Sequence, residues 1–111
     1  MEIRHEQAGP GTAIVTLAGK LTLGSGTERI VAVVERLLGE GTRNVVFDLA
    51  GVTALDSTGV GQFIASFNKI MTAGGQMRMA GASGHVLHTF HVSRLDRMFP
   101  FFPTAEEAAK A

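Results

Sequence analysis

The change from an apolar strand to a helix near the middle of the chain constrains the fold most. Asn44 to Leu49 is a run of β-preferring residues with the length of a central strand that other elements cover. After a turn, a helical apolar pattern starts at Ser57 and continues to the Gly74-Gly75 pair. A buried strand that leads into an amphipathic helix predicts an α/β fold. It also places the hydroxyl of Ser57 at the start of a helix.

Other apolar runs predict a sheet around this strand. The turn signal Ala8-Gly9-Pro10-Gly11 separates two strand patterns and predicts an antiparallel hairpin at the beginning of the chain. Prolines flank a short aromatic segment near the end, which is typical of an edge strand. The expected strands are residues 2–7, 12–17, 44–49, 76–80 and 98–102.

Helical apolar stripes fill most of the intervals between these strands. Ser25-Gly26-Thr27-Glu28 has the spacing of a capping box before a helix that ends at Gly39 and Gly41. Ser83 is placed to cap a third helix, and Thr104 opens a second capping box before a short C-terminal helix. We therefore expect one α/β domain over residues 1–111, with a mixed four- to five-stranded β-sheet and α-helices packed mainly on one face.

Composition excludes several classes of function. Ten basic and ten acidic residues give a formal net charge of zero, so we expect no direct binding of nucleic acid. No apolar run reaches the roughly 18 to 20 residues of a membrane span, and the N-terminus lacks a signal peptide, so we expect no membrane insertion. The absence of cysteine removes disulfides and thiolate chemistry and fits a cytoplasmic protein.

The turn before the central helix is the candidate site. Either Asp56 or Ser57 is placed to cap this helix, and Gly59 and Gly61 are expected to keep side chains away from its first turn. Unpaired amides at a helix start favour an anion by roughly 0.3 to 2 kcal/mol, so this position would accept a phosphorylated Ser57. The alternative is that Ser57 is only an N-cap.

The motif Asp56-Ser57-Thr58-Gly59-Val60-Gly61 resembles the STAS domain, specifically the anti-sigma factor antagonists. The resemblance covers nearly the full length and includes a late segment before the C-terminus. The segments that carry it are residues 17–22, 46–61, 74–79 and 86–95.

This resemblance implies a protein-interaction domain that is not an enzyme and needs no cofactor. In the family, the serine that matches Ser57 is phosphorylated by the partner, an anti-sigma factor that is itself a serine kinase, and a PP2C-type phosphatase restores it. The unphosphorylated form binds the anti-sigma factor and so releases the sigma factor. One alternative is a cytosolic STAS accessory subunit of a membrane lipid-transport ABC assembly, and another is a small-ligand or nucleotide binder.

One departure from the family pattern affects the same site. Many members have Gly-Glu-Leu-Asp after the early strand, whereas this chain has Gly19-Lys20-Leu21-Thr22. Thr22 thus replaces an aspartate that commonly lies near the phosphorylation loop. Lys20 either favours a nearby phosphate or is an ordinary strand-end residue. Thr58 offers a second hydroxyl, but the motif match favours Ser57 as the phosphorylated residue, and Thr58 is expected to support the helix start.

The central helix is also expected to offer part of a partner surface. Phe63, Phe67 and Met71 follow the spacing of a core stripe. The residues between them are expected to face outward beside Ser57 and contact the partner: Gln62, Ser66, Asn68 and Lys69. The aromatic edge segment leaves a weak homodimer open.

The sequence gives little support for a metal site, a serine hydrolase or a nucleotide-binding loop. His85, His88 and His91 recur every third residue, which does not match the i, i+4 pair of a helical zinc site, so we expect no metal. No Gly-x-Ser-x-Gly motif surrounds Ser57, and the Gly-rich stretches lack the lysine of a phosphate-binding loop. Asp48 is expected to make turn hydrogen bonds after the central strand.

Overall fold

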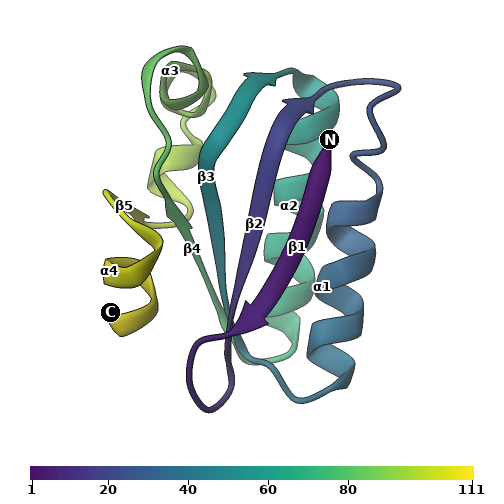
Figure 1. The fold of residues 1–111 in the computed structure, drawn as a ribbon, viewed down its shortest axis with the longest axis vertical. Coiled ribbons are helices and arrows are strands. Elements are labelled where there is room, and N and C mark those ends of the chain that lie inside the picture. Colours follow the sequence, from purple (N-terminus) through teal and green to yellow (C-terminus); the bar gives the residue numbers. More distant parts are fainter.

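A mixed five-stranded sheet forms the frame of the computed structural model, which describes all 111 residues. Its strands follow one another across the sheet in chain order (Figure 1). The first pair is antiparallel and the other three pairs are parallel, which confirms both the hairpin and the predicted mixed sheet. The strands are β1 (Glu2–Gln7), β2 (Thr12–Leu21), β3 (Asn44–Leu55), β4 (Gln76–Ala80) and β5 (Phe101–Phe102).

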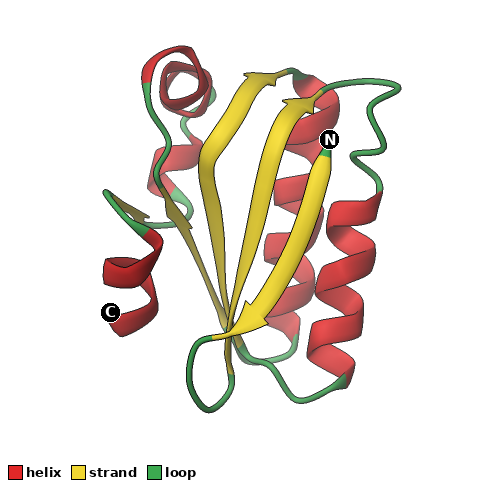
Figure 2. Ribbon diagram, in the orientation of Figure 1, coloured by secondary structure: helices red, strands yellow, loops and turns green.

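The helices lie mainly on one face of this sheet, as predicted (Figure 2). They are α1 (Arg29–Gly39), α2 (Ser57–Thr72), α3 (Gly84–Val92) and α4 (Ala105–Lys110), with a short 3₁₀ turn η1 (Leu95–Arg97) after α3. Phe47 of β3 belongs to the large core that α1, α2 and α3 cover. Its neighbour Val46 packs with Ala108 of α4 on the opposite face, because successive strand residues point to opposite sides.

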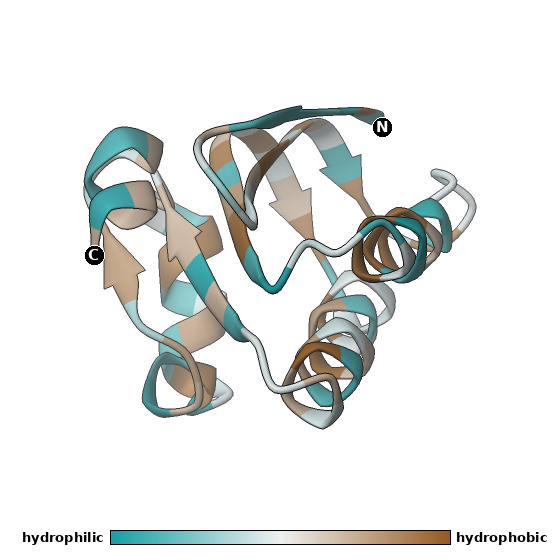
Figure 3. Cartoon of the chain, turned by 90° about the horizontal axis from the view of Figure 1, so that it is seen from below, coloured by the Kyte–Doolittle hydropathy of each residue, from teal (hydrophilic) through white to brown (hydrophobic).

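The core beneath α1 and α2 contains a row of aromatic side chains in contact with one another. The ring centroids of Phe47 and Phe63 are 5.2 Å apart, and those of Phe63 and Phe90 are 5.6 Å apart. These contacts link β3, α2 and α3 through one buried cluster. Seen from below, α1 and α2 lie together on one side of the strands, with polar residues on their outer sides (Figure 3). The start of α2 is thus anchored to the sheet.

The two central strands are longer than predicted. The sequence indicates a turn after Leu49, but β3 continues to Leu55 because this segment pairs with the extended end of β2. Two irregularities in the register allow this pairing, one between Thr16 and Ala18 and the other between Gly19 and Lys20. Asp48 therefore lies within a strand, and its Oδ1 accepts a hydrogen bond of 3.1 Å from the Ala50 amide.

Helix starts agree only in part with the predicted caps. The capping box at Ser25 is wrong, because Glu28 occupies the N-cap position of α1 and makes no side-chain cap bond. Ser83 occupies the N-cap of α3 without such a bond. Thr104 is confirmed as a cap, since its hydroxyl accepts a 3.2 Å hydrogen bond from the Glu107 amide. No helix of the structure combines the length and apolarity required to cross a membrane.

Candidate functional site

Asp56 caps α2 and leaves Ser57 exposed as the first residue of the helix. The Oδ1 atom of Asp56 accepts hydrogen bonds from the amides of Thr58 at 2.9 Å and Gly59 at 3.3 Å. The structure therefore decides between the two predicted caps, and the alternative in which Ser57 is only an N-cap is wrong. The hydroxyl of Ser57 lies at the surface without a capping role.

The second carboxylate oxygen of Asp56 reaches the loop between β2 and α1. Its Oδ2 accepts a 3.0 Å hydrogen bond from the amide of Leu23. This bond and those from Gly59 and Thr58 hold the pKa of Asp56 below its ordinary value of 3.8, with the Leu23 amide as the largest cause. The carboxylate is therefore ionised near neutral pH and joins two segments that are distant in the sequence.

Amides in the first turn of α2 are less available than the sequence suggests. We expected unpaired amides that would receive an anion, but the Asp56 carboxylate already accepts from Thr58 and Gly59. Thr58 is half-buried and contributes its backbone amide to this cap. A phosphate on Ser57 would consequently lie beside an existing negative charge.

The two glycines of the motif have different surroundings. Gly59 is buried, and a Cβ atom there would lie 2.6 Å from Leu55 Cδ1 and closer still to the Leu21 carbonyl oxygen. The expectation that Gly59 opens the approach from solvent is wrong, because this residue faces β2 and allows the helix to pack closely. Gly61 is exposed, and a Cβ atom there would have no neighbour within 4 Å.

The outward surface predicted for α2 is correct for Asn68 and Lys69, which are exposed, and wrong for Ser66. Ser66 is 0% exposed, and its hydroxyl has no hydrogen-bond partner. It belongs to the buried stripe that also contains Phe63 and Ile70. Met71, predicted to be core, is 50% exposed, whereas its neighbour Ile70 is fully buried, so the buried side of this helical turn is the one that carries Ile70.

Gln62 has a structural contact that the sequence did not indicate. Its Oε1 accepts a 3.3 Å hydrogen bond from the amide of Val31 in the first turn of α1. This amide has no partner within its own helix, so Gln62 of α2 acts as a distant cap. The half-buried side chain is thereby tied to α1 rather than directed away from the protein.

The loop after β2 presents one feature that sequence reasoning missed. Leu23 is 81% exposed, the highest value among the large hydrophobic residues that are exposed. Thr22 and Ser25 flank it, and their hydroxyl oxygens lie 2.9 Å apart in a hydrogen bond. Lys20 is exposed near the end of β2, opposite Ala54 of β3. Polar and apolar groups thus occupy the surface next to the start of α2.

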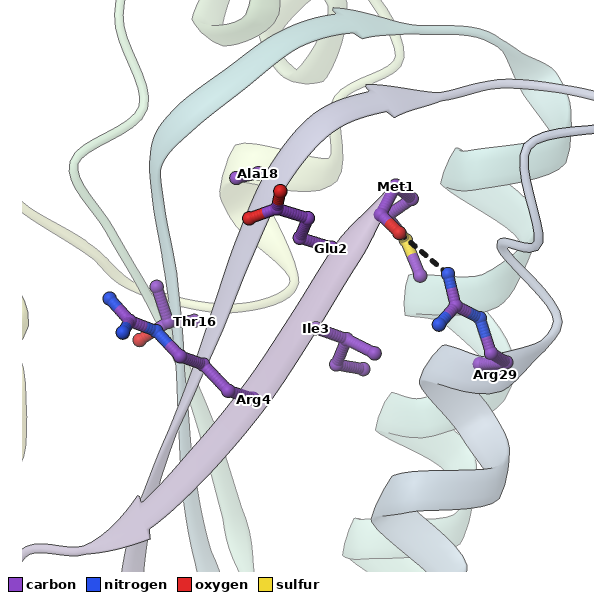
Figure 4. A pocket seen from close by; sticks show the side chains of 7 residues that line it. All are labelled: Met1, Glu2, Ile3, Arg4, Thr16, Ala18 and Arg29. Carbon is purple, nitrogen blue, oxygen red and sulfur yellow. Dashed lines mark hydrogen bonds between the residues drawn. The ribbon is translucent and has the colours of Figure 1, made fainter.

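The hollows of the surface lie elsewhere. The largest has a volume of about 520 Å³ and surrounds the beginning of β1, where an Arg29 nitrogen donates a 2.6 Å hydrogen bond to the Met1 carbonyl (Figure 4). It is lined by Met1, Glu2, Ile3, Arg4, Thr16, Ala18 and Arg29. No hollow includes residues 56–62, so the candidate site is an open surface.

The histidines of α3 have no common site. His91 Nδ1 lies 2.9 Å from Asp96 Oδ2 at the surface, whereas His85 and His88 make no side-chain hydrogen bond or ion pair with another residue. No three side chains of the metal-binding types gather in the structure. The chemistry that the geometry supports is therefore centred on the exposed hydroxyl of Ser57 and the carboxylate of Asp56.

Comparison with known proteins supports the resemblance. A family model described as STAS domain matches residues 6–108. A search of curated proteins found no match.

Solved structures with the same fold belong to more than one functional group. An anti-sigma factor antagonist from Mycobacterium paratuberculosis is 20% identical and has a TM-score of 0.83, covering 99% of this chain and 94% of that chain. The Bacillus cell fate determinant SpoIIAA in its phosphorylated form is 18% identical, with a TM-score of 0.76 and coverage of 98% of each chain. A sulfate transporter family protein from Wolinella succinogenes is 15% identical, with a TM-score of 0.81, 95% of this chain and 87% of that chain covered.

Proposed function

Because this chain belongs to the STAS domain family, we propose that it is an anti-sigma factor antagonist whose binding is controlled by phosphorylation of Ser57. The observation that carries the proposal is that the N-cap of α2 and the exposed hydroxyl at its start belong to different residues. Asp56 caps the helix, so the hydroxyl of Ser57 is exposed and free to be modified without loss of the cap. The domain itself acts by binding and not by catalysis.

The proposed switch has a simple electrostatic basis. A phosphate adds about 1.5 to 2 negative charges at Ser57, next to the ionised carboxylate of Asp56. Binding of a partner that fits the unmodified surface would then be opposed by desolvation of the phosphate or by electrostatic repulsion. If the cost were about 3 kcal/mol, affinity would fall on the order of a hundredfold, which is sufficient to change partners.

The proposed partners follow from the family. The unphosphorylated domain binds an anti-sigma factor that is a serine kinase, and the sigma factor is released. Phosphorylation of Ser57 ends this binding, and a PP2C-type phosphatase restores it. A cytoplasmic setting and a role in bacterial transcription regulation belong to the same proposal. The solved structure of SpoIIAA in a phosphorylated form supports it by showing that a protein of this fold accepts phosphate.

Mass spectrometry of the protein from its native cells tests the proposal. We expect phosphate on Ser57, and we expect it to be absent from Ser57→Ala but present in the matched control Thr58→Ala. Affinity capture with unphosphorylated protein should recover an anti-sigma factor kinase. Unmodified Ser57 under all growth conditions would contradict the switch. Equal capture by the unphosphorylated protein and by protein synthesised with phosphoserine at position 57 would contradict it as well.

The second candidate is a cytosolic STAS accessory subunit of a membrane lipid-transport ABC assembly. The similarity to the sulfate transporter family protein, which shares the fold over most of both chains, supports a link to membrane transport, and the lipid-transport ABC assembly is our proposal for its form. In this case the same affinity capture should recover a transport ATPase and its membrane subunit. Their binding would not depend on the modification state of Ser57.

A further inference from the structure

The carboxylate of Asp56 accepts hydrogen bonds from two segments of the chain. Its Oδ1 atom accepts hydrogen bonds from the first turn of α2, and its Oδ2 atom accepts one from Leu23, which is 33 residues earlier. A serine or threonine at this N-cap has one side-chain oxygen and would satisfy the helix alone. The second oxygen therefore provides a contact that capping does not require.

The Leu23 bond joins the turn after β2 (residues 22–28) to the N-cap of α2, beside a 3.3 Å backbone bond from the Asp56 amide to the carbonyl of Leu21 at the end of β2. The other hydrogen bonds of this turn are internal to it or go to Met1 and to the first residues of α1. Within the turn, the Ser25 amide donates to the Thr22 carbonyl at 3.1 Å, and the two hydroxyls of these residues pair. The Leu23 side chain is 81% exposed and contributes little packing that could hold the turn. Among the hydrogen bonds of residues 22–28, the one to Asp56 Oδ2 is thus the bond that ties the turn directly to the start of α2.

We propose that Asp56 is a positioning residue that holds the turn around Leu23 beside Ser57, and that a phosphate on Ser57 loosens this link. The second half of the inference rests on the proposed function. A phosphate on the residue next to Asp56 repels the carboxylate and adds three acceptor oxygens beside it. The partner then meets a displaced Leu23 as well as a new charge, so both changes act on one surface.

Hydrogen exchange of the free chain, followed residue by residue by NMR, tests the positioning role. The variant Asp56→Ser keeps a cap for the first turn of α2 but is too short to reach Leu23 as well. We expect exchange of the Leu23 amide to rise about tenfold while the Gly59 amide changes less than about twofold, and the melting temperature should fall less than in Asp56→Ala. Asp56→Ala, which removes both contacts, should accelerate exchange at both amides.

These measurements can overturn the inference. A Leu23 amide that exchanges freely in the parent protein, or at an unchanged rate in both Asp56 variants, would show that the carboxylate does not hold the turn. Parallel changes at Leu23, Gly59 and the core amides would show general destabilisation instead, and would equally refute a specific positioning role.

The phosphate step is tested by placing phosphoserine at position 57 during synthesis. We expect exchange of the Leu23 amide to accelerate about fivefold or more. The matched control carries phosphoserine at Ser83, an exposed N-cap position on α3, and should leave Leu23 unchanged. An unchanged Leu23 amide in the phosphorylated protein would refute this step. Because no partner or kinase is present, that result is distinct from failure of the proposed function, which would appear as unmodified Ser57 in cells.

Discussion

Replacement of Gly59 by alanine should destabilise the domain, although alanine is the better helix former. The new Cβ would lie 2.6 Å from Leu55 Cδ1 and 3.0 Å from Leu21 Cβ, and it would also overlap the Leu21 carbonyl oxygen. Part of this obstacle is backbone, which a side-chain rotation does not relieve. Relief requires the start of α2 to move away from β2, which would disturb the Asp56 cap.

Two opposing terms set the magnitude. Overpacking of a well-filled site costs about 1 to 3 kcal/mol, whereas exchange of a helical glycine for alanine contributes about 0.5 to 1 kcal/mol in the other direction. The expected net loss in the free energy of unfolding for Gly59→Ala is about 1 to 2 kcal/mol. Since about 1 kcal/mol corresponds to roughly 4 °C in a domain of this size, the melting temperature should fall by roughly 4 to 8 °C.

Gly61→Ala is the matched control. Gly61 lies in the same helix, two residues further on, but it is exposed and has no atom within 4 Å of an added Cβ. Only the helix-propensity term applies, so the melting temperature should rise by roughly 2 to 4 °C. Thermal unfolding followed by circular dichroism measures both variants. Equal shifts, or a more stable Gly59→Ala protein, would refute the argument that close packing against Leu21 requires a glycine.

Substitutions of Ser66, Thr104 and Asp56 give three further predictions. Ser66→Ala should raise the free energy of unfolding by about 1 kcal/mol in urea titrations, because it removes a buried hydroxyl without a partner and introduces a better helix former; a loss of stability would reveal a hydrogen bond of Ser66. Thr104→Ala should cost about 1 kcal/mol by removing the cap of α4, and Thr104→Ser should retain most of it; equal losses would contradict the capping role. Asp56 has a lowered pKa in the folded state, so its ionised carboxylate stabilises the fold above the ordinary value of 3.8, and this contribution is lost as pH falls through the lower folded value. The melting-temperature difference between the parent and Asp56→Asn should therefore be largest near neutral pH and shrink below pH 3.8, and a difference that grows in acid would contradict the assignment.

Local patterns predicted the elements that depend on neighbouring residues. The hairpin, the start of α2 at Ser57 and the strand Gln76–Ala80 all appear where the sequence indicates them. The segment from Ala50 to Leu55 was missed because its strand conformation depends on pairing with β2 across two irregularities of register. Ser66 was misplaced because a small polar residue fits either the outer or the inner side of an apolar stripe.

The sequence by itself determined the order of the elements, the α/β class and the presence of a hydroxyl at the start of the central helix. These follow from hydrophobic period and turn chemistry, which act over a few residues. Only the tertiary structure decided that Asp56 caps α2, that its second oxygen holds Leu23 and that Gly59 faces Leu21. The physical reason is the sheet: it brings the ends of β2 and β3 side by side, so residues more than thirty positions apart share one carboxylate.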